Sequence, residues 1–153
     1  MEKKAMSKSE PKSKGATKAG NGQYIFDMTR LAKMDAGPGY SSANGPVVEG
    51  DRIQVGLIKF MRGTGARPHS HPNEQWIYIL KGKVRVMVDN QPEKLVSEGA
   101  LIYLPANVVH SMAGLPDEDV VFFTCKDMSH GIIGMAADGT MSGPHYEPGF
   151  EPK

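Results

Sequence analysis

Short runs of β-branched and aromatic residues, separated by turn-forming residues roughly every ten positions, fill most of this chain after its first fifty residues. Runs of this length and spacing predict an antiparallel sandwich or barrel. They cover residues 52–61, 76–80, 83–89, 101–104 and 120–125. With 153 residues in total, the chain has the length of one ordinary domain, and a single barrel suffices.

The run at 83–89 shows the alternation most clearly. Because side chains along a strand point to opposite faces in turn, Val84, Val86 and Val88 are predicted to face the core and the charged residues between them to face solvent. Residues 89–91, Asp-Asn-Gln, are predicted to form a hairpin tip. Earlier in the chain, residues 24–28 are predicted as an edge strand, 27–34 as one or two helical turns and 37–45 as a loop.

The first twenty-two residues differ from the rest in composition. Residues 1–22 hold six Lys against two Glu, a net charge of +4, whereas residues 23–153 hold 12 Lys and Arg against 15 Asp and Glu, a net charge of −3. The segment lacks apolar periodicity, so we expect a disordered Lys-rich tail over 1–22 and a folded domain over 23–153. Nucleic-acid binding through this tail is not expected, because no aromatic residue lies between its lysines.

Cysteine and apolar content restrict the cellular setting. The single Cys125 rules out an internal disulfide and fits a reducing compartment, and we expect it to be a buried structural thiol. We see no apolar stretch of the roughly twenty residues that a membrane helix needs, and no secretory signal. We therefore expect no membrane contact and a cytoplasmic location.

Four polar residues in two distant segments form a candidate metal site. His69 and His71 are separated by one residue, so on a strand both imidazoles project from the same face and can reach one ion. Gln75, or the adjacent Glu74, follows where the strand turns, and His110 comes from a later segment. Such a nitrogen-rich set suits a divalent transition metal ion, with Fe, Mn, Ni and Zn all possible. His130 and His145 are expected to be surface or hydrogen-bonded residues.

The spacing of these residues resembles the two motifs of the cupin superfamily. The first motif is matched over residues 63–82 by Gly63, His69, His71, Gln75 and Gly82. The second is matched over residues 99–114 by Gly99, Pro105, Asn107 and His110. Asn107 stands where glycine is usual, but asparagine also tolerates the left-handed conformation of a turn.

The resemblance implies a single jelly-roll-like β-barrel with the metal in its mouth, and a homodimer. It also selects Gln75 over Glu74 as the fourth ligand. The local sequence is most similar to small monocupins with three histidines and one glutamine, including the pectin-degradation type that acts on unsaturated uronates. That type carries an acid on its last barrel strand, whereas the run at 120–125 has none. We therefore expect a less polar or aromatic substrate in an apolar cavity.

Other side chains near the motifs have predicted roles. Arg67 lies two residues before His69, so on a regular strand it would face the ion and could bind a carboxylate or enolate; a surface guanidinium at the rim is the alternative. Ile77 and Ile79 share the register of Gln75 and should line the cavity. Trp76 and Tyr78 should face away from it.

A neutral amide in place of a carboxylate leaves the ion as a stronger Lewis acid and disfavours higher oxidation states. With one coordination position open, we expect a metal-dependent enzyme for a small carbonyl, enol or phenolic substrate. The chemistry would be that of an oxygenase or of a non-oxidative lyase or isomerase. The alternative is a cupin module that binds a small ligand without catalysis.

Overall fold

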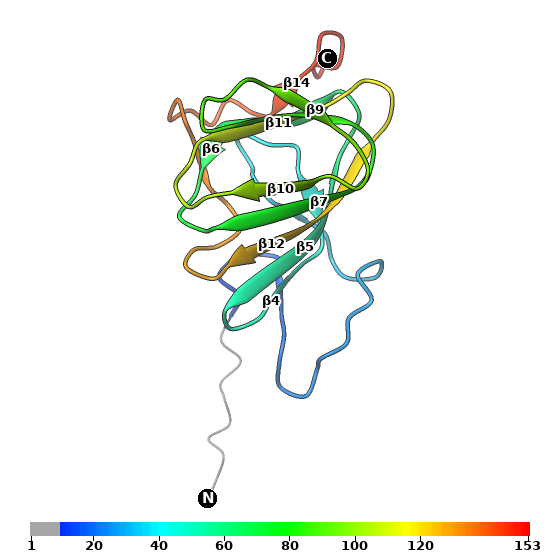
Figure 1. Cartoon of the computed structure of the whole chain (residues 1–153). Helices are drawn as coiled ribbons and strands as arrows, with labels where there is room; N and C mark the ends of the chain where they lie inside the picture. Colours follow the sequence, from blue (N-terminus) through cyan, green and yellow to red (C-terminus); the bar gives the residue numbers. More distant parts are fainter. Residues whose placement is uncertain (1–9) are drawn as a thin grey trace, which may run out of the picture.

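The computed structural model describes residues 10–153 as two β-sheets that lie one against the other (Figure 1). The larger sheet has the strand order β1-β4-β5-β12-β7-β10, with β3 paired to β5 and β2 paired to β3. Its strands are β1 (Thr17–Lys18), β2 (Met34–Asp35), β3 (Asn44–Gly45), β4 (Val47–Glu49), β5 (Ile53–Phe60), β7 (Gln75–Lys81), β10 (Leu101–Leu104) and β12 (Val120–Asp127).

The smaller sheet has the order β13-β6-β11-β8-β9, with β14 also paired to β6. Its strands are β6 (Thr64–Ser70), β8 (Val84–Val88), β9 (Lys94–Val96), β11 (His110–Gly114), β13 (Met135–Ala136) and β14 (His145–Tyr146). The expected all-β, jelly-roll-like fold is confirmed. Within residues 10–153, no helix has the length and apolar character needed to cross a lipid bilayer.

The predicted β-runs all correspond to strands, with boundaries that shift by a few residues. The run expected at 120–125 continues to Asp127 as β12. In β8, Val84 and Val86 are buried as expected and Val88 is half-buried. The hairpin tip is also confirmed, because Asp89 and Asn90 both have positive φ and Gln91 N–H donates to the Val88 carbonyl.

Two predictions for the segment before the barrel are wrong. Residues 24–28 do not form a strand, and 27–34 do not form a helix. The Asp27 carboxylate accepts hydrogen bonds from the backbone N–H and the hydroxyl of Thr29. Such a side-chain turn competes with helix formation. Tyr24 and Ile25 are exposed, so no apolar contact fixes this stretch as an edge strand.

The prediction of disorder over residues 1–22 is wrong for residues 10–22; residues 1–9 lie outside the described part of the chain. Strand β1 pairs in parallel with β4. The buried Glu49 carboxylate of β4 accepts hydrogen bonds from the backbone N–H groups of Lys12 and Ser13. The segment is therefore held by a buried polar contact, which a search for apolar periodicity does not detect.

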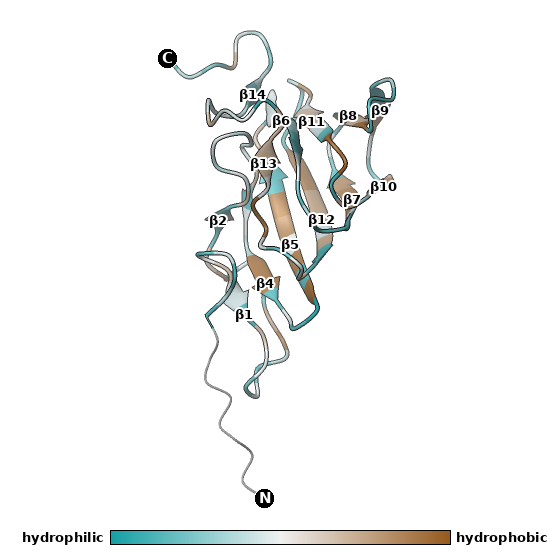
Figure 2. Cartoon of the chain, turned by 90° about the vertical axis from the view of Figure 1, so that its left-hand side faces the viewer, coloured by the Kyte–Doolittle hydropathy of each residue, from teal (hydrophilic) through white to brown (hydrophobic). Residues whose placement is uncertain are grey.

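The core lies between the two sheets and draws apolar side chains from both. The hydrophobic stretches of β4 and β5 are among the brown segments in Figure 2. Ile58 and Phe60 of β5 and Ile77 and Ile79 of β7 are almost fully buried. Full burial of one such side chain stabilises the fold by about 1.5–3 kcal/mol. Trp76 and Tyr78 face solvent instead, so the predicted register of β7 is confirmed.

Candidate metal centre

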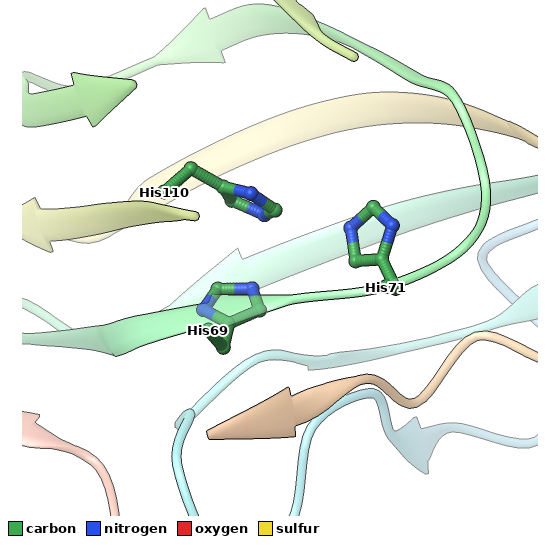
Figure 3. Close-up of side chains that lie close together, drawn as sticks. All are labelled: His69, His71 and His110. Atoms are coloured by element: carbon green, nitrogen blue, oxygen red, sulfur yellow. The ribbon is translucent and has the colours of Figure 1, made fainter. Parts of the chain in front are cut away.

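Three histidines from two distant segments meet between the sheets, at one end of the strands that carry them. His69 belongs to β6, His71 is the first residue after the end of β6, and His110 is the first residue of β11. One nitrogen of each lies within 4.8 Å of one nitrogen of the others. Figure 3 shows the three rings turned toward a common space. The convergence predicted from the sequence is confirmed.

Strand pairing and one turn position the rings. His110 is the direct antiparallel partner of His69, which places their ring centroids 4.2 Å apart. The chain reaches His110 through Asn107, whose φ is +65° and whose backbone N–H donates to the His71 carbonyl at 2.8 Å. Asn107 thus adopts the left-handed conformation expected of it and links the two motifs.

Backbone carbonyls fix the tautomer of all three imidazoles. The Nδ1 atoms of His69, His71 and His110 lie 2.7–3.0 Å from the carbonyl oxygens of Arg67, Asn73 and Val108. Because a carbonyl only accepts, each Nδ1 must carry the proton. Each Nε2 is then left with a lone pair directed away from that carbonyl, as in a metal-binding histidine whose other nitrogen is hydrogen-bonded.

The orientation of the Gln75 amide follows from a chain of hydrogen bonds. The Thr124 hydroxyl donates to the Trp76 carbonyl, so it can only accept from Gln75 Nε2, at 2.7 Å. Gln75 Oε1 is therefore the atom that lies 2.9 Å from His71 Nε2. Both side chains are neutral, so a lone pair of Gln75 Oε1 and the lone pair of His71 Nε2 face each other.

This contact between two acceptors suits a cation. All four candidate ligand side chains are buried: His69 is 8% exposed, His71 3%, Gln75 6% and His110 2%. A divalent ion among three imidazole nitrogens and one amide oxygen would satisfy every lone pair and match the donor types that Fe, Mn, Ni or Zn accept. The residues present therefore fit the metal site that the sequence predicts.

The histidines are neutral over the physiological pH range. Burial lowers the pKa of His69 to about 2, of His71 to about 3 and of His110 to about 4. Repulsion from the positive charge of Lys126 also lowers the pKa of all three. Neutral imidazole is the form that binds a metal ion, so no proton competes near pH 7.

The geometry favours Gln75 over Glu74 as the fourth ligand. Glu74 is exposed, and its carboxylate accepts a hydrogen bond from the Tyr103 hydroxyl, away from the histidines. His130 is exposed, and His145 lies 3.2 Å from the Glu147 carboxylate. Neither of these two histidines belongs to the cluster of metal-ligating groups found in residues 10–153.

The prediction that Arg67 faces the ion depends on a regular strand, and β6 is not regular. His69 pairs with His110 and Ala66 pairs with Met112, so β6 accommodates an extra residue next to Pro68. The Arg67 guanidinium instead donates to the carbonyls of three residues and to the Asp138 carboxylate. The carbonyls belong to Gly39, Thr140 and Gly143. Arg67 ties the C-terminal segment to an early loop, and this geometry does not favour its predicted role as a substrate clamp.

A cavity of about 50 Å³ adjoins the histidines. Its walls include Ile77, Phe122 and Ile132, as expected for an apolar pocket. Ile79 is fully buried in the core but is not part of this lining, so its predicted place in the wall is wrong. The wall also includes Tyr40, whose ring stacks on His69 with 4.4 Å between centroids.

Sequence reasoning missed Tyr40, Thr124 and Lys126. Tyr40 lies in a loop, where no periodicity indicates its direction. Thr124 and Lys126 do carry a signal, because Val120, Phe122, Thr124 and Lys126 alternate and are all buried. The expected strand stopped at Cys125, which is only half-buried and faces the other side. Lys126 therefore fell outside the predicted strand.

Comparison with known proteins agrees with this geometry. Residues 56–125 match the sequence profile of the cupin domain family. No curated protein sequence matches the chain.

Among solved structures, KdgF from Halomonas sp. is 21% identical, with 68% of this chain and 92% of that chain covered and a TM-score of 0.57. The polyketide cyclase RemF from Streptomyces resistomycificus is 19% identical, with 69% and 79% covered and a TM-score of 0.60. The DMSP lyase DddQ from Ruegeria pomeroyi is 17% identical, with 62% and 47% covered and a TM-score of 0.54.

Some of the matched proteins are much longer than the matching region. This chain spans 58% of a cupin-like protein from Thermotoga maritima and 38% of a chain in a structure of DMSP lyases. The domain match, the two facing sheets and the converging histidines lead to one conclusion: the chain has the cupin fold, and its residues 56–125 are similar to the cupin domain family.

Proposed function

We propose that this protein is a metal-dependent enzyme that acts on a small oxygenated substrate bound at an open position of the ion. The contact between His71 Nε2 and Gln75 Oε1 carries the proposal. Two buried acceptors held 2.9 Å apart are unfavourable unless a cation lies beside both. His69 and His110 supply the remaining donors, and the adjoining cavity gives room for a substrate.

The donor set favours non-oxidative chemistry over oxygenation. When bound, the ion would polarise a carbonyl or enol oxygen as a Lewis acid, undiminished by any carboxylate ligand. The chain's own residues orient and shield the reacting group: Thr124 holds the Gln75 amide, Tyr40 packs on His69, and Phe122 helps to exclude water. This arrangement supports a lyase, isomerase or cyclase reaction on a carbonyl or enol substrate.

The names of two similar structures point in the same direction, since one is a lyase and one is a polyketide cyclase. At 17% and 19% identity, the likeness shows the fold alone. The donor atoms of the site therefore carry the proposal, and the two named activities suggest substrates for assay.

Turnover with and without oxygen tests the proposal. The metal-loaded protein is incubated with a panel of diketones, flavonols, phenols and enolisable acids, in air and under strict anaerobic conditions. We expect anaerobic turnover that stops when the metal is removed. Oxygen consumption would identify an oxygenase instead, and tight ligand retention without turnover would identify a binding module.

We further propose that the protein is a cytoplasmic homodimer. Trp76, Tyr78, Tyr103 and Phe123 form an exposed aromatic surface on the outer face of the larger sheet. A second copy of the chain would cover this surface. Light scattering coupled to size-exclusion chromatography should give twice the 16.6 kDa mass of the chain. A monomer at micromolar concentration would contradict this proposal.

A further inference from the structure

Lys126 is a buried cationic residue in the wall of the cavity beside the histidines. It is 5% exposed and lies on β12 directly opposite Gln75 of β7. Together with His69, His110 and Gln75, it lines the cavity. Burying a lysine is costly, so its presence here calls for a physical reason.

The hydrogen bonds of Lys126 leave part of its donor capacity unused. Its Nζ donates to the Ile132 carbonyl at 2.7 Å, and this is its only hydrogen bond within residues 10–153. An ammonium group carries three N–H donors. In the same part of the chain, no carboxylate lies within the 4.0 Å that defines an ion pair with Nζ. Lys126 is thus an incompletely satisfied cation.

The cavity contains no negative charge of its own. No Asp or Glu lines it, while Lys126 and the proposed metal ion would both contribute positive charge. Burial lowers the pKa of Lys126 to about 7, which reflects the cost of holding an ammonium group there without an anion. A negatively charged ligand would relieve the repulsion between the two cations and satisfy the free donors of Nζ.

We propose that the cavity binds a small carboxylate anion and that Lys126 Nζ is the group that binds its carboxylate. The inference rests on the proposed function only in that the metal ion supplies the second point of attachment. A volume of about 50 Å³ limits the enclosed part of the ligand to a few non-hydrogen atoms, so the cavity itself holds the carboxylate and little more. In this proposal, Lys126 takes the anion-binding role that the sequence suggested for Arg67, in a cavity whose walls also include Ile77, Phe122 and Ile132.

Acetate and acetamide test this assignment, because they share a shape and differ in charge. Binding of each is measured by absorption titration of the Co²⁺-loaded protein and by calorimetry of the metal-free protein. The wild type is compared with Lys126→Met, which keeps the side-chain length and removes the charge. Lys94→Met is the matched control, because Lys94 is exposed on β9 of the other sheet. Elemental analysis gives the metal content of all three proteins.

We expect the loaded wild type and Lys94→Met to prefer acetate over acetamide. We expect Lys126→Met to bind acetate about tenfold more weakly at an unchanged metal content, as for loss of a hydrogen bond to a charged group. Equal acetate affinity in wild type and Lys126→Met would overturn the assignment. If Lys126→Met does not fold, equal affinity of the wild type for acetate and acetamide is sufficient to overturn the assignment. A wild type that takes up no metal would refute the proposed function, and the metal-free titration then decides the role of Lys126.

Discussion

At the scale of single residues, hydrogen bonds determine which atom of each ligand side chain keeps a free lone pair. Thr124 fixes the Gln75 amide, and three backbone carbonyls fix the imidazole tautomers. The direction of each lone pair is thus set before any ion binds. A site whose donors are held in place loses little conformational entropy on binding, which favours tight and selective metal uptake.

Removing one imidazole should empty the site. His110→Ala deletes one of three nitrogen donors and leaves a polar space beside the other two rings, so we expect the metal content to fall sharply. Elemental analysis of wild type and variant, prepared in parallel, measures this. His130→Ala is the matched control, because His130 is exposed and outside the cluster. Unchanged metal content in His110→Ala would refute its role as a ligand.

Changing the charge of the fourth ligand should alter reactivity more than occupancy. Gln75→Glu keeps an oxygen at the same position and adds a negative charge, which weakens the Lewis acidity of the ion. We expect the variant to retain the metal and to lose non-oxidative turnover. A variant that loses the metal would argue against Gln75 as a direct ligand.

The role of Thr124 can be tested without touching a ligand. Thr124→Val preserves the shape of the side chain but removes the hydroxyl that holds Gln75 Nε2. Loss of such an orienting partner typically costs 10–100-fold in metal affinity. We expect a loss of about tenfold in a competitive chelator titration, and recovery of affinity in Thr124→Ser. If Thr124→Val binds metal as tightly as the wild type, the hydroxyl does not position the amide.

At the scale of secondary-structure elements, the sequence predicted the barrel strands well where apolar and polar residues alternate. Val84 and Val86 of β8 are examples, because burial on one face leaves a period of two in the sequence. Elements held by polar contacts were not predictable in this way. The bulge beside Pro68 in β6 changes the face toward which Arg67 points. The segment that leads into β1 is attached through Glu49 and not through apolar side chains.

The attachment of the N-terminal segment makes a prediction for Glu49. Glu49→Gln replaces a buried acceptor oxygen by an N–H₂ group that faces backbone N–H donors of the segment. We expect a loss of about 2 kcal/mol in the free energy of unfolding, in the range for hydrogen bonds to a charged group. Urea denaturation measures it, with Glu98→Gln at an exposed loop position as the control. Equal stability of the two variants would show that the carboxylate does not hold the segment.

At the scale of the whole molecule, the metal centre couples stability to pH. Since the pKa values of His69, His71 and His110 in the metal-free folded state are about 2, 3 and 4, all three stay largely neutral at pH 5, whereas histidines of the unfolded chain take up protons below about pH 6.5. The unfolded state therefore binds more protons as the pH falls, and stability must fall with it.

We expect a loss of roughly 2 kcal/mol per histidine between pH 7 and pH 5 in the metal-free protein. Lys126 also makes the protein less stable as the pH falls toward 7. Its pKa is lowered in the folded state, so above pH 7 the unfolded chain binds a proton at this residue more tightly than the folded chain does. Denaturant midpoints at several pH values measure both effects. A metal-free protein as stable at pH 5 as at pH 7 would contradict the burial of neutral imidazoles.

The whole fold brings together residues that the sequence separates by about forty positions, and the spacing of the two motifs was sufficient to predict this. The spacing could not predict the cavity chemistry, because Tyr40 and Lys126 enter it from a loop and from the end of a strand. The direction of Tyr40 depends on packing between the two sheets, which no local pattern records. Lys126 continues the alternation of β12 but lies beyond the predicted end of that strand.

The most direct test of the metal centre is anomalous X-ray diffraction from crystals of protein purified without an affinity column or added metal. We predict one ion per chain, bound by Nε2 of His69, His71 and His110 and by Oε1 of Gln75, at metal–ligand distances of about 2.0–2.2 Å. Metal-free histidines in protein grown with ample transition metals, or an ion bound elsewhere, would contradict this account.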